Sequence, residues 1–179
     1  LSEAEYLSLA KSIKEICDAD WKDLTIERLP EIPDFTLLVG WTGQVAITDS
    51  LIQATEKKRK VSTDSEFYKD FLKKSHAIVQ GLQTAWNKQD IPALQEGIRA
   101  NRALLNEFAK VMQLEIETPA LQTLCDLAEQ VGACAKTSGA GGGDCGICFT
   151  QNETQKQQIE NQWAKAQIQV LPLTIAEAW

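Results

Sequence analysis

The sequence lacks a long apolar run, a surplus of basic residues and an even set of cysteines. No apolar run approaches the roughly 20 residues that cross a bilayer, which predicts that the chain has no membrane span. The net charge of −7 disfavours nonspecific binding to nucleic acid or to an anionic membrane, because both need a basic surface. The five cysteines are irregularly spaced, which disfavours a disulfide framework and favours a reducing, cytoplasmic compartment.

Side chains that bind metals or act as catalytic bases are also scarce. His76 is the only histidine, and its place beside an apolar helical stripe favours a solvated or core-edge side chain over a catalytic base. Cys145 and Cys148 form a CxxC pattern, but residues three apart on a strand point to opposite faces. We therefore interpret the two cysteines as structural and predict no metal site in this chain.

The apolar pattern predicts strands near both ends of the chain and helices in the middle. The 179 residues, 44% of them hydrophobic, suffice for one core. Because strands and helices do not alternate throughout, we predict an α+β fold, an antiparallel sheet with helices packed on one face. The nearly continuous apolar run at 34–42 predicts a strand that is buried on both faces. The other expected strands are 24–30, 133–136, 145–150 and 168–174; the expected helices are 1–21, 48–60 and four that begin near 63, 90, 118 and 152.

Five of the ten glycines fall between Ala135 and Phe149, in the stretch AKTSGAGGGDCGICF. Such a run lets the backbone adopt positive φ angles, so that successive N–H groups can turn toward an anion, and lets a phosphate approach without meeting Cβ atoms. Lys136 could add charge, and Thr137 and Ser138 could add hydroxyl donors. We favour this phosphate cradle over a flexible hairpin, because a tight hairpin rarely needs four glycines.

Two common nucleotide motifs do not account for the glycines. No Gly-Lys-Ser or Gly-Lys-Thr follows them, so the Walker pattern fails. A G-x-G-x-x-G exists at Gly141, Gly143 and Gly146, but a strand-like segment follows it where that fingerprint requires a helix. The role of Asp144 is open between metal binding and capping of the loop through backbone N–H groups, and we favour capping.

The stretch KTSGAGGGDCGI resembles the third conserved motif of the GHMP kinases, and its Asp-Cys-Gly ending is most similar to the phosphomevalonate kinases within that superfamily. A second stretch, DFTLLVGWTGQVAITDSLI, resembles a strand-turn-helix of the same enzymes. The resemblance covers roughly 24–170. It implies a ferredoxin-like sheet, residues 24–179 as a GHMP kinase C-terminal domain, and residues 1–23 as a connecting helix from an N-terminal domain that this sequence lacks.

The resemblance also implies an activity, which is the transfer of the γ-phosphoryl group of ATP, with Mg²⁺, to phosphomevalonate in isoprenoid biosynthesis. No Gly-Leu-Gly-Ser-Ser loop of the N-terminal half occurs here, so we expect no catalytic residue in this chain and no activity from it alone. The predicted phosphate- and substrate-binding residues are Lys136, Thr137, Ser138, Gly139, Ala140, Gly141, Gly142, Gly143 and Asp144.

Four further residues are candidates for substrate contact. Asn101 interrupts an apolar helical stripe, so it is either a satisfied buried amide or part of a cleft, and Arg102 would suit a carboxylate or phosphate. Trp41 and Thr42 end a strand and could border the cleft, although core packing explains Trp41 more simply. Two alternative functions stay open, namely another GHMP enzyme (mevalonate kinase or diphosphomevalonate decarboxylase) and a non-catalytic ferredoxin-like module that binds an anion.

Overall fold

The computed structural model describes residues 12–18, 29–33, 35–44, 66–139 and 141–173. Residues 12–17 are helical, in agreement with the helix expected at the start of the chain. The rest of that helix, residues 24–28 of the strand expected at 24–30, the helix expected at 48–60 and Ala140 lie outside the described residues. Residues 29 and 30, the described end of that expected strand, are not in a strand.

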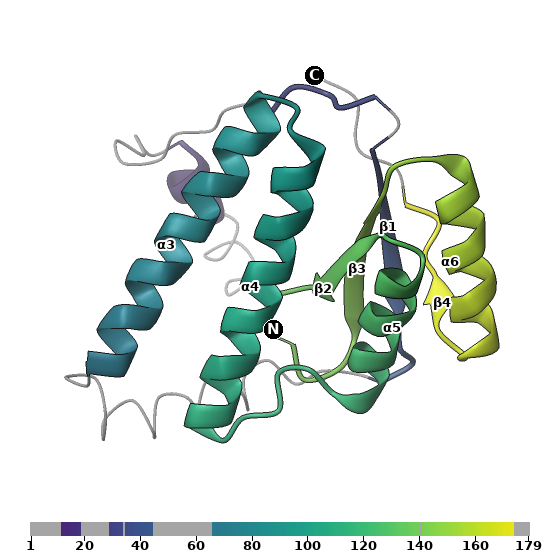
Figure 1. Cartoon of the computed structure of the whole chain (residues 1–179). Coiled ribbons are helices and arrows are strands. Elements are labelled where there is room, and N and C mark those ends of the chain that lie inside the picture. Colours follow the sequence, from purple (N-terminus) through teal and green to yellow (C-terminus); the bar gives the residue numbers. More distant parts are fainter. Residues whose placement is uncertain (1–11, 19–28, 34, 45–65, 140, 174–179) are drawn as a thin grey trace.

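Four antiparallel strands form one sheet in the order β2-β3-β1-β4. Among the described residues, three helices lie between β1 and β2 and one helix lies between β3 and β4, which is the ferredoxin-like arrangement. Figure 1 shows this sheet beside the long antiparallel pair of helices α3 and α4. The strands are β1 (Thr36–Trp41), β2 (Cys134–Thr137), β3 (Cys145–Thr150) and β4 (Gln169–Val170).

The helices begin where the sequence supplies capping side chains. The side chains of Asp90, Thr118 and Asn152 each accept a hydrogen bond from the backbone N–H three residues later, which satisfies one of the free donors of a helix start. Proline follows in the first turn of two of these helices. The helices are α3 (Glu66–Asn87), α4 (Ile91–Met112), α5 (Pro119–Gln130) and α6 (Glu153–Lys165).

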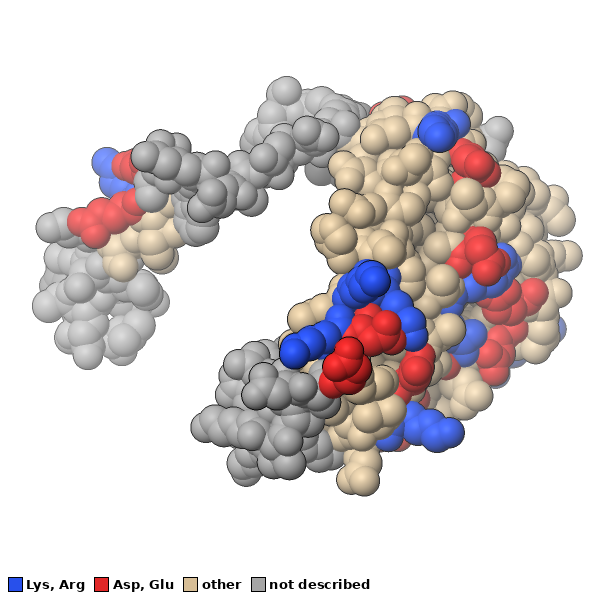
Figure 2. Space-filling model, turned by 60° about the vertical axis from the view of Figure 1, so that its left-hand side comes forward, with Lys and Arg blue, Asp and Glu red and all other residues tan. Residues whose placement is uncertain are grey.

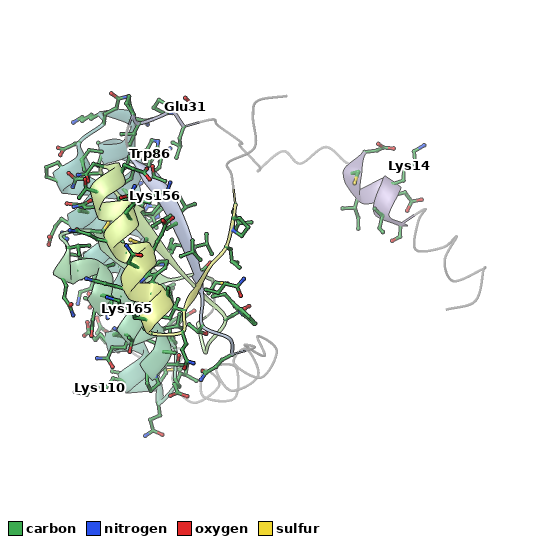
Figure 3. All side chains as sticks on the ribbon, turned by 90° about the vertical axis from the view of Figure 1, so that its right-hand side faces the viewer. Lys14, Glu31, Trp86, Lys110, Lys156 and Lys165 are labelled. Carbon is green, nitrogen blue, oxygen red and sulfur yellow. The ribbon has the colours of Figure 1, made fainter. Side chains whose placement is uncertain are left out.

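Helices α5 and α6 cover one face of the sheet (Figures 1 and 3), and two glycines let them approach closely. Gly40 on β1 and Gly146 on β3 are register partners. A Cβ atom on Gly40 would lie 2.7 Å from the Trp163 ring, and one on Gly146 would lie 2.6 Å from Leu124. Trp163 is fully buried and donates its indole N–H to the Leu124 carbonyl at 3.0 Å. Helices α5 and α6 therefore pack directly against the backbone of this glycine pair.

The other face of β1 is only partly covered, so the expectation of a strand buried on both faces is wrong. Buried and half-buried residues alternate along β1, and Leu37, Val39 and Trp41 are half-buried. At one end of this face, Phe35 stacks on Phe149 with ring centroids 4.9 Å apart, and Trp86 meets both rings edge-on.

The end of α3 holds the segment before β1. The Trp86 indole N–H donates to the Pro30 carbonyl at 2.7 Å, and the Gln89 amide donates to the Glu31 carbonyl at 3.0 Å. Figure 3 shows Trp86 and Glu31 at this end of the molecule. The chain thus enters β1 along a fixed path.

The face that carries α3 has acidic and basic side chains intermingled over its described part, without a large field of one sign (Figure 2). One contributor is the exposed pair of Lys74 and Asp70, one turn apart on α3 and 2.7 Å from each other. Within the described part of the chain, no helix is both long and apolar enough to cross a membrane.

Candidate functional site

The glycine loop, residues 138–144, joins β2 to β3 with an unusual backbone. Its described glycines all have positive φ, from 65° at Gly139 to 130° at Gly143, and Asp144 follows with a φ of 60°. L-residues with side chains rarely adopt this region, so the run of glycines is a conformational requirement. The expectation that the loop uses positive φ angles is confirmed.

The loop is bonded to the segment that follows β1. The Thr42 N–H and hydroxyl both donate to the Asp144 carbonyl at 2.9 Å, and the Asp144 N–H donates to the Gln44 carbonyl at 2.6 Å. Trp41, the last residue of β1, is the register partner of Cys145. The fold therefore brings Trp41 and Thr42 beside the loop, although they lie about a hundred residues before it in the sequence.

A second support comes from the connection between α4 and α5. The Gly142 N–H donates to the Ile116 carbonyl at 2.8 Å. A Cβ atom on Gly141 would lie 2.3 Å from that same oxygen and 2.6 Å from the Ile116 side chain. Gly141 is therefore required by close packing as well as by its φ of 74°.

These supports divide the loop into an open part and a packed part. Ser138 and Gly139 are exposed, whereas Gly141 and Gly143 are buried. The Ser138 N–H donates to the Cys145 carbonyl at 2.9 Å, while the Gly139 N–H has no acceptor among the described residues. Gly139 also has open space where its Cβ would be, so the open part is where an anion could reach the backbone.

Lys136 and Asp144, the two charged residues of the predicted site, differ in their contacts and in their exposure. The Lys136 ammonium donates to the Thr137 carbonyl at 2.8 Å, and burial lowers the pKa of Lys136. The Asp144 carboxylate is exposed, and within the described residues its side chain has one contact, the Cys145 thiol at 3.8 Å. Among the described residues, Asp144 is tied to the segment after β1 through its backbone N–H and carbonyl groups. Capping of the loop by its carboxylate stays a prediction.

Arg102 and Asn101 lie on α4, and Arg102 is engaged with other protein groups. Its guanidinium contacts both oxygens of Glu117, at 2.8 and 2.5 Å, and Asp126 at 2.9 Å. Its side chain is 17% exposed. Asn101 is half-buried. A role for either residue in substrate contact stays a prediction.

The described residues contain no group of three or more histidine, cysteine, aspartate or glutamate side chains that could hold a metal ion. His76 is exposed on α3. Cys148 is buried and Cys145 is half-buried, and both are free thiols. A structural role for the CxxC pattern stays a prediction.

Ile116, whose carbonyl accepts the Gly142 N–H, could not be assigned to the site from the sequence. The stretch LEIETP shows a capping threonine and a proline at the start of α5, but nothing local ties it to the glycines. The close packing at Gly40 could not be predicted from the sequence either, although Gly40 lies in the stretch DFTLLVGWTGQVAITDSLI that carries part of the resemblance.

The fold and the glycine loop define a class of protein, and comparison with known families agrees. The sequence model for the C-terminal region of GHMP kinases matches residues 78–169. The chain belongs to the GHMP kinase family and corresponds to its C-terminal domain.

Two of the similar proteins are phosphomevalonate kinases. The chain is 38% identical over 160 residues to the phosphomevalonate kinase of Streptomyces sp. strain CL190, a match covering 88% of this chain and 42% of that protein. It resembles the structure of the Lin0012 protein from Listeria innocua with a TM-score of 0.81 and 33% identity, over 94% of this chain and 47% of that one. For Streptococcus pneumoniae phosphomevalonate kinase in complex with phosphomevalonate and AMPPNP, the TM-score is 0.73 and the identity 28%, over 89% and 44% of the two chains. The chain spans less than half the length of each.

Proposed function

We propose that this chain is the C-terminal part of a phosphotransferase that converts phosphomevalonate and ATP to diphosphomevalonate and ADP. The observation that carries the proposal is the 38% identity to a phosphomevalonate kinase over most of this chain. The glycine loop supports it, because its open part presents bare backbone, and Thr42, which follows β1, is hydrogen-bonded to Asp144 of the same loop. The other half of the site would come from an N-terminal GHMP domain, and residues 1–23 would form the connecting helix.

The loop would act by positioning and by electrostatics. Phosphoryl transfer depends mainly on alignment and on neutralising the charge of the equatorial oxygens. In our proposal the backbone N–H of Gly139 and the hydroxyl of Ser138 contact a phosphate, while Gly141, Gly142 and Gly143 set the shape of the loop. Lys136 and Thr137 lie at its base. No group in this chain is assigned the catalytic proton transfer.

ATP would bring Mg²⁺, which would offset the negative charge of the phosphates. Mg²⁺ commonly uses only one or two protein carboxylates beside phosphates and water. The exposed Asp144 carboxylate fits such a single contribution, and the absence of a three-ligand cluster among the described residues is compatible with it. We also propose a cytoplasmic location, which the free cysteines support.

A coupled ADP-release assay on the complete protein that contains this chain tests the substrate assignment. We expect ATP-dependent turnover with phosphomevalonate and none with mevalonate. Turnover with mevalonate but not with phosphomevalonate would contradict the assignment. Decarboxylation of diphosphomevalonate would indicate a diphosphomevalonate decarboxylase instead. The 179-residue chain by itself serves as the control and is expected to release no ADP.

A further inference from the structure

The peptide unit that supports the glycine loop is covalently next to a buried carboxylate. The carbonyl that accepts the Gly142 N–H belongs to the peptide joining Ile116 to Glu117. The Glu117 side chain is 8% exposed. Fixing the Glu117 side chain therefore limits the positions that its Cα atom can take, and with them those of the adjoining peptide.

Two side chains contact the Glu117 carboxylate, and a third holds one of them in place. Arg102 contacts both carboxylate oxygens in a fork, and the Asn106 amide donates to one of them at 3.0 Å. Arg102 is held in turn by Asp126 on α5 at 2.9 Å. Such two-point pairs restrict orientation as well as distance. Burial by itself would raise the pKa of Glu117, but the hydrogen bonds from Arg102 and Asn106 outweigh it and lower the pKa.

The residue on the other side of the peptide is fixed by apolar contacts. The Ile116 side chain is buried with Phe108, Ala109 and Met112. Its Cγ2 atom occupies the space that a Cβ on Gly141 would need. The α4–α5 connection is therefore held from both sides, with its carbonyl directed at Gly142.

We propose that Glu117 is a positioning residue for the glycine loop, anchored by Arg102 and Asn106 so that the Ile116 carbonyl holds Gly142 in place. This inference rests on the proposed function only for its effect on turnover. It assigns Arg102 to the support of the loop instead of to the substrate.

A second ion pair on the same two helices provides a matched control. Arg99 on α4 contacts Glu129 on α5 at 2.8 Å and also donates to the Ala133 carbonyl. This pair stands away from the α4–α5 connection, and its side chains are 35% and 32% exposed. Glu129→Gln therefore makes the same chemical change at another carboxylate that is paired with an α4 arginine, away from the α4–α5 connection that supports the loop.

Amide hydrogen exchange in the 179-residue chain tests the positioning directly. After correction for any change in global stability, we expect Glu117→Gln to speed exchange at the Gly142 N–H at least tenfold. Glu129→Gln should leave that rate within twofold of the parent chain. Equal rates at Gly142 in the two variants would overturn the proposal, whatever the activity of the protein.

Steady-state kinetics on the complete protein provide the second test. For Glu117→Gln we expect kcat per folded enzyme to fall at least tenfold. The kcat of Arg102→Lys should fall by a similar factor, because lysine cannot contact both Glu117 oxygens in a fork. Glu129→Gln should keep kcat within twofold. If the parent protein does not turn over phosphomevalonate, the proposed function fails while the exchange experiment still decides the role of Glu117. If it does and Glu117→Gln keeps its kcat, the positioning proposal fails.

Discussion

At the scale of single residues, Glu117 gives the fold a defined dependence on pH. Its pKa lies below the usual value of 4.5 in the folded chain, because hydrogen bonds from Arg102 and Asn106 outweigh the effect of burial. The folded state thus binds this proton more weakly than the unfolded state does. The resulting stabilisation is complete well above pH 4.5 and is lost as the pH falls through the lower folded-state pKa.

This sign gives a prediction for Glu117→Gln. At neutral pH the substitution should lower the free energy of unfolding by about 2 kcal/mol, the scale of hydrogen bonds to a charged group. The difference between parent and variant should shrink toward zero as the pH is lowered below the folded-state pKa. Denaturant unfolding at several pH values measures it, and a difference that does not change with pH would contradict the prediction. Glu129→Gln should lower the free energy of unfolding by a smaller amount at neutral pH, because the Arg99–Glu129 pair is more exposed.

The cysteines should divide into reactive and protected thiols. Burial raises the pKa of Cys125 to about 12 and that of Cys134 to about 11, and it also raises the pKa of Cys148. Cys17 is exposed, and Cys145 is half-buried beside the loop, where burial and the Asp144 charge raise its pKa.

Alkylation of the native chain near neutral pH should therefore modify Cys17 first and Cys145 more slowly, because thiolates are the reactive form. The other three thiols should react only after denaturation. Mass spectrometry of digested protein locates the labels. Modification of Cys125, Cys134 or Cys148 in the native chain at the rate of Cys17 would show that the core opens readily.

At the scale of elements, the β1–β3 pair depends on two positions that have no side chain. Gly40→Ala places a methyl group 2.7 Å from Trp163 and 2.9 Å from Leu124, so the helices must shift. Overpacking of this kind typically costs about 1–3 kcal/mol. We expect thermal unfolding of Gly40→Ala at a clearly lower temperature than that of the parent chain.

Gly81 supplies the matched control for this substitution. It lies within α3, and a Cβ there would meet nothing within 4 Å. Gly81→Ala should raise the free energy of unfolding by about 0.5–1 kcal/mol, because alanine is the better helix former. Equal effects of the two substitutions would mean that the contact at Gly40 does not limit stability.

At the scale of the whole molecule, local patterns predicted most of the elements. The strand at 145–150 and the caps at Asp90, Thr118 and Asn152 were readable, because each depends on neighbouring residues. The resemblance to GHMP kinases added the ferredoxin-like topology. The apolar run of β1 overstated its burial, because apolar composition cannot show how much of each sheet face other elements cover.

The structure of the glycine loop was only partly predictable from local sequence patterns. Its positive φ angles followed from composition, but its division into an open and a packed part did not. That division depends on Ile116 and Gln44, which reach the loop only after α4, α5 and β1 are assembled. Arg102 is likewise only a candidate for substrate contact in the sequence, where nothing local shows that Glu117 and Asp126 meet its guanidinium.

The glycine pair beneath Trp163 has one more consequence, which concerns errors of strand pairing. A slip of β1 by one residue against β3 would turn its buried face outward, and burial alone prevents it. A slip by two residues would keep the same faces inward, so hydrophobicity cannot reject it. It would, however, put Leu38 or Thr42 where Gly40 now lies against Trp163, and neither side chain fits there. The two glycines thus disfavour strand registers that are shifted by two residues. Only the observed register brings Thr42 to Asp144, where its hydrogen bonds close the glycine loop.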